Sequence, residues 1–251
     1  MSNGIYCFIA LLQNDRHGHK KEIDMCKDRG MPDVKPRRES GFNRGIFISV
    51  EGGDGSGKST QLANIREYLE GRGIDALFIR EPGGTSIGEK IRDILLDPAN
   101  SEMCAMTEAL LYAASRAQIV SEVIKPALAS GKLIICDRFV DSSIAYQAYG
   151  RQMGDAIWDI NKYAVDYAMP DYTFFLDINP HIALDRIDNR GENKDRMELQ
   201  EDSFRTRVHN GYLALMEDEA NRDRIIRIDA SKGIEAVKTD IIDKLEEILD
   251  K

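Results

Sequence analysis

Cysteine is scarce in this chain, with four in 251 residues. Cys7, Cys26, Cys104 and Cys136 lack the paired spacing that zinc ligands show. Two of them lie in or beside apolar runs, as expected for reduced thiols in a reducing compartment. The sequence therefore predicts neither a zinc site nor a disulfide framework, and it is typical of a cytoplasmic protein.

Long apolar runs and an excess of positive charge are also missing. No apolar run approaches the length of a membrane span. The short run at residues 6–12 has no basic leader and no small-residue cleavage site, so we expect no secretory signal. The net charge of −9 argues against a general nucleic-acid or anionic-membrane binder, although a local basic site for phosphates is compatible with it.

Residues 1–43 differ from the rest of the chain. They hold eight Lys and Arg against six Asp and Glu, which is net +2 and leaves −11 for residues 44–251. The acidic residues are interleaved with the basic ones, unlike those of a transit peptide. We expect this N-terminal extension to be a disordered tail or to follow from a start codon placed too early, with Met31 as the alternative start.

From residue 44 onward, apolar strand patterns alternate with helical patterns, which predicts one α/β domain at residues 44–251. We expect strands at residues 46–51, 75–80, 133–137, 172–177 and 225–228. We expect helices near residues 58–71, 86–96, 105–130, 141–168, 179–188, 199–220 and 232–250. Strands this apolar predict a five-stranded parallel sheet with helices on both faces, whose ligands bind at the carboxyl ends of the strands.

The first predicted strand leads into a glycine-rich loop and then a helix. The loop reads G-x-x-x-x-G-K-S and ends at Lys58 and Ser59, with the strand and helix that a phosphate-binding P-loop requires on either side. Lys58 is suited to the β- and γ-phosphates of a nucleoside triphosphate, and the Ser59 hydroxyl to Mg²⁺. The alternative is an ordinary Gly-rich turn. The predicted ATP-binding residues are Gly52, Gly53, Asp54, Gly55, Ser56, Gly57, Lys58, Ser59 and Thr60.

Charged residues follow the next predicted strands. Arg80 and Glu81 open a turn after the second strand, and Asp137 and Arg138 end the third. Asp137 has the position of a carboxylate that holds Mg²⁺ through water opposite the phosphate loop. The alternative for Asp137 is capping of the next helix.

Two further groups of residues suit a nucleotide. Tyr112 and Arg116 lie four residues apart in a helical pattern and share a face, which suits an aromatic base and its polar edge. The alternative is a core tyrosine beside a surface arginine. Arg186, Arg190 and Arg196 fall in a polar stretch that predicts a mobile lid over a triphosphate, the alternative being a solvated loop of mixed charge.

These motifs, in this order, resemble the bacterial thymidylate kinases. The resemblance covers residues 45 to about 250, and its most specific parts are Arg80-Glu-Pro-Gly-Gly-Thr and Asp137-Arg-Phe followed by Ala145-Tyr-Gln. It implies the P-loop NTPase fold with an arginine-rich lid segment, and transfer of the ATP γ-phosphoryl group to dTMP, giving dTDP and ADP. It also implies Mg²⁺ as cofactor and a homodimer, with no nucleic-acid or membrane partner.

The resemblance further implies the roles of individual residues. The catalytic residues would be Lys58, Arg138, Arg186, Arg190 and Arg196, with the lid arginines replacing an arginine that this phosphate loop lacks. The dTMP-binding residues would be Asp54, Arg80, Glu81, Tyr112, Arg116, Arg138, Ser143, Tyr146 and Gln147. Asp54 would meet the sugar 3′-hydroxyl or steer Arg138 by charge. Metal contacts would be Ser59 and, through water, Asp137. Asp195 and Glu198 resemble second-shell metal or sugar-contacting acids.

Three other functions compete with this one. Another nucleoside-monophosphate kinase would share the loop, the lid and Asp137-Arg138. A GTPase switch would carry Asn-Lys-x-Asp after a strand, which the sequence lacks. A silent protein that keeps a nucleotide for stability would leave the arginines without a purpose. Because a phosphate nucleophile needs no general base, the lack of a catalytic His or Cys constellation is expected. His181 and His209 fall in helical patterns away from the predicted strand ends, and we expect them to be structural.

Overall fold

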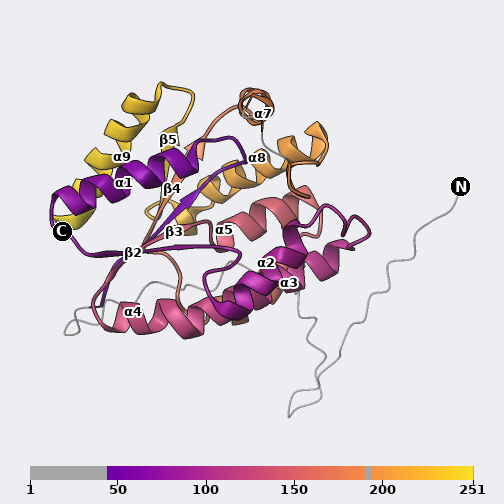
Figure 1. Cartoon of the computed structure of the whole chain (residues 1–251), viewed down its shortest axis with the longest axis horizontal. Coiled ribbons are helices and arrows are strands. Elements are labelled where there is room, and N and C mark those ends of the chain that lie inside the picture. Colours follow the sequence, from indigo (N-terminus) through magenta and orange to yellow (C-terminus); the bar gives the residue numbers. More distant parts are fainter. Residues whose placement is uncertain (1–43, 190, 192–193, 251) are drawn as a thin grey trace, which may run out of the picture. The chain divides into compact units, whose positions relative to one another are not determined.

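The computed structural model describes residues 44–189, 191 and 194–250, which form an α/β fold around one sheet. The strands are β1 (Phe47–Glu51), β2 (Ala76–Arg80), β3 (Leu133–Asp137), β4 (Tyr172–Asp177) and β5 (Ile225–Asp229). They pair in parallel in the order β2-β3-β1-β4-β5 (Figure 1). The predicted five-stranded parallel sheet is confirmed, with one end of β1, β2 and β5 shifted by one residue. The expectations for residues 1–43 lie outside the described residues.

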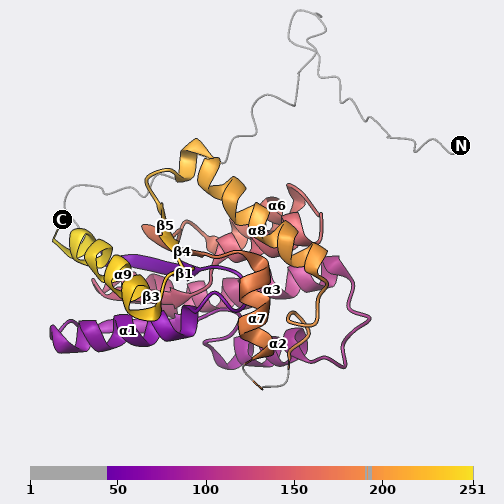
Figure 2. The same cartoon turned by 90° about the horizontal axis from the view of Figure 1, so that it is seen from above.

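Side chains alternate between the two faces of each strand, and both faces of β1 are covered. Ile48 and Val50 belong to a buried cluster with side chains of α1 (Lys58–Gly71) and α9 (Ile234–Leu249). These two helices lie side by side in both views (Figure 1, Figure 2). Phe47 points to the other face, into a cluster with Ile119, Val120 and Phe139. This double coverage explains why the whole of β1 is buried, and it holds the start of the phosphate loop in place.

The remaining helices are placed by the same alternation of strand and helix. They are α2 (Ser86–Leu96), α3 (Ala105–Ile119), α4 (Lys125–Ala129), α5 (Val140–Ser143), α6 (Ala156–Val165), α7 (Pro180–Asp188), α8 (Asp202–Glu217), the π-helices η1 (Val120–Ile124) and η2 (Ile144–Gly150), and the short 3₁₀ helix η3 (Glu219–Asn221). None of the helices in the described ranges is both long enough and apolar enough to cross a membrane.

The helix expected at residues 141–168 is wrong as one continuous element. It begins at Val140 in α5, widens into η2, stops at Gly150, and resumes as α6 at Ala156. Between the two parts, Gln152 and Gly154 both have φ of +59°, in the left-handed region that a right-handed helix cannot use. The helical spacing of apolar residues continues across this break, so the sequence pattern does not reveal where the helix stops.

The helix expected at residues 105–130 is continuous but not regular. It runs from α3 through η1 into α4, where Pro126 has no backbone N–H to donate to the preceding turn. The wider hydrogen-bonding turn of η1 lies directly before this proline.

Two glycines allow η2 and α8 to approach each other closely. A Cβ atom on Gly211 of α8 would lie 2.9 Å from the Ala145 Cα, and one on Gly150 would lie 2.7 Å from Phe204 Cε2. Both distances are too short for a real Cβ contact. The close packing fixes η2, which carries Tyr146 and Gln147, against α8.

Candidate active site

The phosphate loop lies between the end of β1 and the start of α1. Gly55 has φ of +78°, and a Cβ there would lie 2.2 Å from the Ala183 carbonyl oxygen of α7. Gly57, directly before α1, has φ of +94°. Position 55 requires glycine on both counts, because the left-handed conformation disfavours side chains and α7 leaves no room for one, whereas at Gly57 the conformation alone favours glycine. The loop therefore ends at the N-terminus of α1, where free backbone N–H groups suit phosphate oxygens.

Lys58 is the first residue of α1, and its side chain folds back over the loop. Its Nζ donates to the carbonyl oxygens of Gly52 at 3.0 Å and Gly53 at 3.1 Å. Burial lowers the pKa of Lys58 to about 8, the charge of Arg138 lowers it as well, and the charge of Asp137 opposes both. The amine is thus held above the loop by carbonyl groups that an anionic ligand can replace.

A cavity of about 820 Å³ lies at the carboxyl ends of β2 and β3, in front of the phosphate loop. It is lined by most of the predicted site residues, namely Asp54, Gly55, Gly57, Lys58, Ser59, Thr60, Arg80, Glu81, Tyr112, Arg116, Asp137, Arg138, Ser143, Tyr146, Gln147 and Arg186. Gly52, Gly53, Ser56 and Arg196 are not among the residues that line it. Arg190 lies outside the described residues.

Arg138 and Asp54 form an ion pair at the floor of the cavity. Arg138 donates through one terminal nitrogen to Asp54 Oδ1 at 2.5 Å, and through the other to the Gly52 carbonyl at 2.8 Å. The Tyr146 hydroxyl donates to Asp54 Oδ2 at 3.0 Å. Burial alone would raise the pKa of Asp54, but the charges of Arg138 and Lys58 bring it below its ordinary value. The carboxylate therefore stays ionised and directs the guanidinium along the loop.

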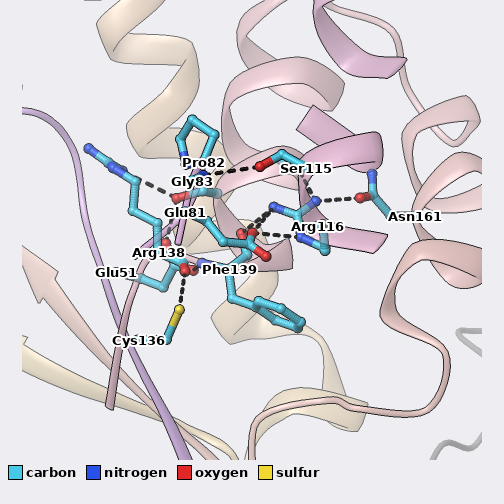
Figure 3. Close-up of polar contacts among 12 residues, drawn as sticks. Glu51, Glu81, Pro82, Gly83, Ser115, Arg116, Cys136, Arg138, Phe139 and Asn161 are labelled. Atoms are coloured by element: carbon cyan, nitrogen blue, oxygen red, sulfur yellow. Dashed lines mark hydrogen bonds and ion pairs between the residues drawn. The ribbon is translucent and has the colours of Figure 1, made fainter. Parts of the chain in front are cut away.

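Arg116 is buried, with 2% of its surface exposed, and each nitrogen of its guanidinium contacts a partner within the protein (Figure 3). The guanidinium pairs with Glu81 Oε2, donates to the Ser143 hydroxyl at 2.8 Å and to the Phe139 carbonyl at 3.1 Å, and makes a short bond to the Asn161 side chain. The alternative of a surface arginine is therefore wrong. Arg116 organises the cavity wall, and it can meet a base only by releasing one of these partners.

Glu81 and Asp137 each present a carboxylate oxygen that has no hydrogen-bond partner within the described part of the chain. Burial raises the pKa of Glu81 to about 7, and the charge of Arg116 opposes the shift. Phe139, not Asp137, is the N-cap residue of α5, so the helix-capping alternative for Asp137 is wrong. Its unpartnered buried oxygen, beside a cavity also lined by Ser59, fits a hydrated divalent cation. The Glu81–Pro82 peptide bond is cis.

The expectation that Arg196 reaches a triphosphate is wrong. Its guanidinium is buried, donating to Glu108 Oε2 at 2.7 Å and to the Leu95 carbonyl at 2.7 Å. Arg151 pairs with the same carboxylate at 2.9 Å. The buried Glu108 requires such partners, because an unpaired charge in the interior is highly unfavourable. Arg186, at the end of α7, is exposed and does line the cavity.

We expect Arg196→Ala to lower the free energy of unfolding by about 1–3 kcal/mol, because Glu108 loses one of its buried donors. Urea denaturation followed by circular dichroism measures this effect. Arg186→Ala is the matched control, and its exposed position predicts a change within about 0.5 kcal/mol. Equal losses in the two variants would contradict the assignment of Arg196 to the core.

The acidic residues of the lid segment border the cavity. Asp195 and Glu198 both line it. Asp195 Oδ1 accepts the backbone N–H groups of Met197 and Glu198 at 2.8 Å each. Burial raises the pKa of Asp195 above its ordinary value. This carboxylate therefore shapes the turn that carries Glu198 to the cavity.

The expectation for the histidines is also wrong in part. His209 lies on α8, but its Nε2 is 2.7 Å from Oδ1 of Asp177, the last residue of β4. Arg227 pairs with the other oxygen of Asp177 at 2.5 Å. His209 therefore does contact a strand end. His181 is exposed near the start of α7.

Sequence reasoning missed two residues of the site. Arg92 of α2 lines the cavity and donates to the Pro82 carbonyl at 2.9 Å. It lies four residues from both Gly88 and Leu96, on the inward face of α2, and a basic residue on that face was the available signal. Asn161 of α6 bonds to Arg116, but no local pattern marks it, because the contact joins residues 45 positions apart.

Comparison with known proteins agrees with this geometry. The model of the thymidylate kinase family matches residues 50–241. The chain is 47% identical over 200 residues to a thymidylate kinase of an Exiguobacterium species, covering 79% of this chain and 93% of that protein. It is 48% identical over 209 residues to the thymidylate kinase of Lactobacillus helveticus, covering 82% and 98%. With a match that spans the phosphate loop, the cavity and the lid segment, the chain belongs to the thymidylate kinase family.

Proposed function

We propose that this cavity transfers the γ-phosphoryl group of ATP to dTMP, giving dTDP and ADP. One observation carries the proposal: Lys58 and Arg138 lie in one cavity between a phosphate loop and a second wall built from Tyr112, Arg116 and Gln147. The loop side suits a triphosphate, and the wall side suits a base and sugar. The phosphates of two substrates bound on opposite sides would meet beside the charged side chains of Lys58 and Arg138.

The residues of the loop would hold ATP by charge and by backbone hydrogen bonds. Lys58 would exchange the Gly52 and Gly53 carbonyls for phosphate oxygens, and the N-terminus of α1 would bind the β-phosphate. Ser59 and, through water, Asp137 would hold Mg²⁺, which would neutralise charge on the phosphates when bound. Arg186 would approach the triphosphate from α7.

Arg138 would bind the phosphate of dTMP and bridge towards the transferred group. That phosphate is already anionic at neutral pH, so no side chain has to remove a proton from the nucleophile. Alignment of the two substrates and a high density of positive charge are what the protein supplies.

The wall of the cavity would recognise the acceptor. Tyr112 would stack on thymine, Ser143 and Gln147 would meet its polar edge, and Tyr146 and Asp54 would approach the sugar. Ser143 and Gln147 are each 2% exposed and already bonded to Arg116 and Glu108. Their orientation is thus set before any ligand arrives, which favours selection of one base. Arg80, Glu81 and Arg92 would complete the acceptor side.

We also propose that the protein is a cytoplasmic homodimer. Exposed apolar side chains lie on two neighbouring helices, Ile87 and Ile94 on α2 and Met106 and Leu110 on α3. Such a surface suits burial against a second copy. Sedimentation velocity, which reports the mass in solution, tests this assignment.

A coupled assay of ADP release over a panel of acceptors tests the proposed reaction. We expect turnover with dTMP to exceed turnover with dUMP, dCMP and AMP. Another monophosphate kinase on this scaffold would share the phosphate loop, and a clear preference for AMP would overturn the thymidylate assignment.

We expect Arg116→Ala to raise the KM for dTMP and leave the KM for ATP nearly unchanged, because Arg116 holds Glu81 and Ser143 in the acceptor wall. The same change leaves a buried carboxylate unpaired, so it lowers the free energy of unfolding by about 3–5 kcal/mol. Steady-state kinetics at low temperature, with thermal unfolding in parallel, separates the two effects. Asn161→Ala removes a single partner of Arg116 and should produce a smaller shift of the same kind. Unchanged dTMP kinetics in Arg116→Ala would remove this residue from the acceptor site.

A further inference from the structure

Arg138 occupies an unfavourable backbone conformation. Its φ of +67° lies in the left-handed region, which residues with a side chain rarely adopt. Such a conformation persists only where surrounding contacts enforce it. The Arg138 N–H donates to the Val50 carbonyl at 3.0 Å, and the Arg138 carbonyl accepts from the Cys136 thiol at 2.9 Å. The next N–H, that of Phe139, donates to Glu51 Oε1 at 2.6 Å (Figure 3).

Glu51 is the last residue of β1, and it is completely buried. Besides the Phe139 N–H, its carboxylate accepts from the Ser142 hydroxyl at 2.6 Å and from the Tyr212 hydroxyl at 3.0 Å. These donors belong to three segments: the turn after β3, helix α5 and helix α8. Glu51 is not among the residues that line the cavity, so it has no direct contact with its contents.

The carboxylate reaches Arg138 from two sides. On one side it holds the peptide group that follows Arg138. On the other side, Ser142 donates to Glu51 while its oxygen accepts from a terminal nitrogen of Arg138 at 3.2 Å. The backbone and the guanidinium of Arg138 are therefore both connected to one carboxylate.

Burying the carboxyl group of Glu51 lowers the stability of the fold, because the charged form loses its hydration. Burial, together with the charge of Asp141, raises the pKa of Glu51 to about 7, and the Ser142 hydrogen bond and the charge of Arg138 oppose this. An apolar residue would avoid the desolvation, as replacements of buried ionic groups show. The carboxylate must therefore do something that an apolar side chain would not, and two of its three donors, the Phe139 N–H and the Ser142 hydroxyl, lie next to Arg138 or contact it.

We propose that Glu51 is a positioning residue for the transfer reaction, which holds Arg138 in its left-handed conformation so that the guanidinium lies along the phosphate loop. This inference rests on the function proposed above for Arg138. Loss of the carboxylate would free the turn between β3 and α5, and Arg138 would relax away from Gly52 and Asp54. The phosphate of the acceptor would then lose its alignment, whereas ATP, held by the loop and Lys58, would keep its own.

The test is a double-mutant cycle between Glu51→Gln and Arg138→Ala, with kcat and both KM values measured. Glutamine fills the same volume, but its single carbonyl oxygen cannot accept both from the Phe139 N–H and from the two hydroxyls, so one of the two connections to Arg138 is lost together with the charge. We expect Glu51→Gln to lower kcat/KM for dTMP on the order of 10²-fold, as misplacement of a reacting group does. The KM for ATP should stay the same, and in the Arg138→Ala background the same change should have no further effect.

Two matched variants separate positioning from general support of the fold. Tyr212→Phe removes one hydrogen bond from the same carboxylate and leaves the Phe139 contact in place, so we expect its kcat/KM to stay close to that of the wild type. Glu70→Gln makes the same chemical change on the exposed face of α1 and should have no effect. If Glu51→Gln does not fold, Glu51→Asp keeps the charge, withdraws it from the Phe139 N–H, and should lower kcat/KM for dTMP in the same selective way.

The outcomes are distinct. Losses that multiply in the double variant would overturn the proposal, because Glu51 would then act independently of Arg138. A lower melting temperature with unchanged kinetics would also overturn it, since the role would be structural only. If Arg138→Ala alone keeps full activity, the function proposed for Arg138 fails, and that single variant identifies this failure without reference to Glu51.

Discussion

Replacing Lys58 with alanine is expected to reduce kcat by at least about 10³-fold and to leave dTMP binding intact. The expected loss is this large because Lys58 is the only lysine among the residues that line the described cavity, and it lies over the phosphate loop with its Nζ already poised there. Transition-state charge on the phosphates is stabilised most strongly by a fixed cation in a site shielded from water. A coupled assay of ADP release measures kcat, and isothermal titration with dTMP measures binding. Loss of dTMP binding in the same variant would place Lys58 on the acceptor side instead.

The lowered pKa of Lys58 predicts that activity falls at alkaline pH. The pKa of Lys58 is lowered to about 8 by burial and by the charge of Arg138. Below this pKa the ammonium carries the charge that attracts phosphate, and above it the charge is lost. We therefore expect kcat/KM for ATP, which reports the free enzyme, to fall as the pH rises through about 8. In Lys58→Arg the cation does not titrate in this range, so a persisting alkaline limb would assign the ionisation to another group.

Arg138→Ala is expected to have the second largest effect, lowering kcat/KM for dTMP by about 10³-fold, as removal of an arginine does in other phosphoryl transfers. The guanidinium is held along the loop by Asp54 and the Gly52 carbonyl, where it can reach both the acceptor phosphate and the transferred group. Lysine cannot replace it, because a single ammonium lacks the planar fork that makes both contacts.

Asp54→Asn tests how much the orientation of the Arg138 guanidinium contributes, because Arg138 itself is still present in this variant. The amide keeps the shape of the carboxylate and loses its charge, so we expect a loss of roughly tenfold in kcat/KM for dTMP, the size of one charged hydrogen bond. Steady-state kinetics with varied dTMP measures both variants. If Arg138→Ala raised only the KM for ATP, Arg138 would belong to the donor side of the cavity.

The sequence was most informative where function depends on local order. The turn from β1 through Gly55 and Gly57 to Lys58 is a contiguous segment whose glycines, apolar strand and helix are each required at fixed spacing. Asp137 and Arg138 could be located for a related reason, because strand ends of a parallel sheet share one edge. Such features are present in short stretches of sequence before any tertiary contact forms.

Prediction was least successful where the position of a side chain is determined by a contact with a residue distant in the sequence. Arg196 looked like a lid arginine because its neighbours are polar, but Glu108, 88 positions away, draws it into the core. His209 contacts a strand end through Asp177, 32 positions away. The helical spacing of Tyr112 and Arg116 predicts Arg116 in the site, but not its contacts with Glu81 and Asn161. In each case the burial of a carboxylate or amide elsewhere decides where the polar group lies, and periodicity contains no information about that.

The π-helix η2 has a consequence for how this site tolerates change in chain length. A π turn contains more residues than an α turn, and η2 carries Tyr146 and Gln147 in such a turn. Each residue of an α-helix is rotated by about 100° from the one before it. Deletion of one residue here would let the segment rewind as an α-helix with its two ends still in register, but the side chains inside the wide turn would change direction by up to about that angle. Tyr146 would then leave Asp54. The number of residues in η2 therefore matters as much as their identity. A chimaera that replaces η2 with the matching segment of a relative should keep that number.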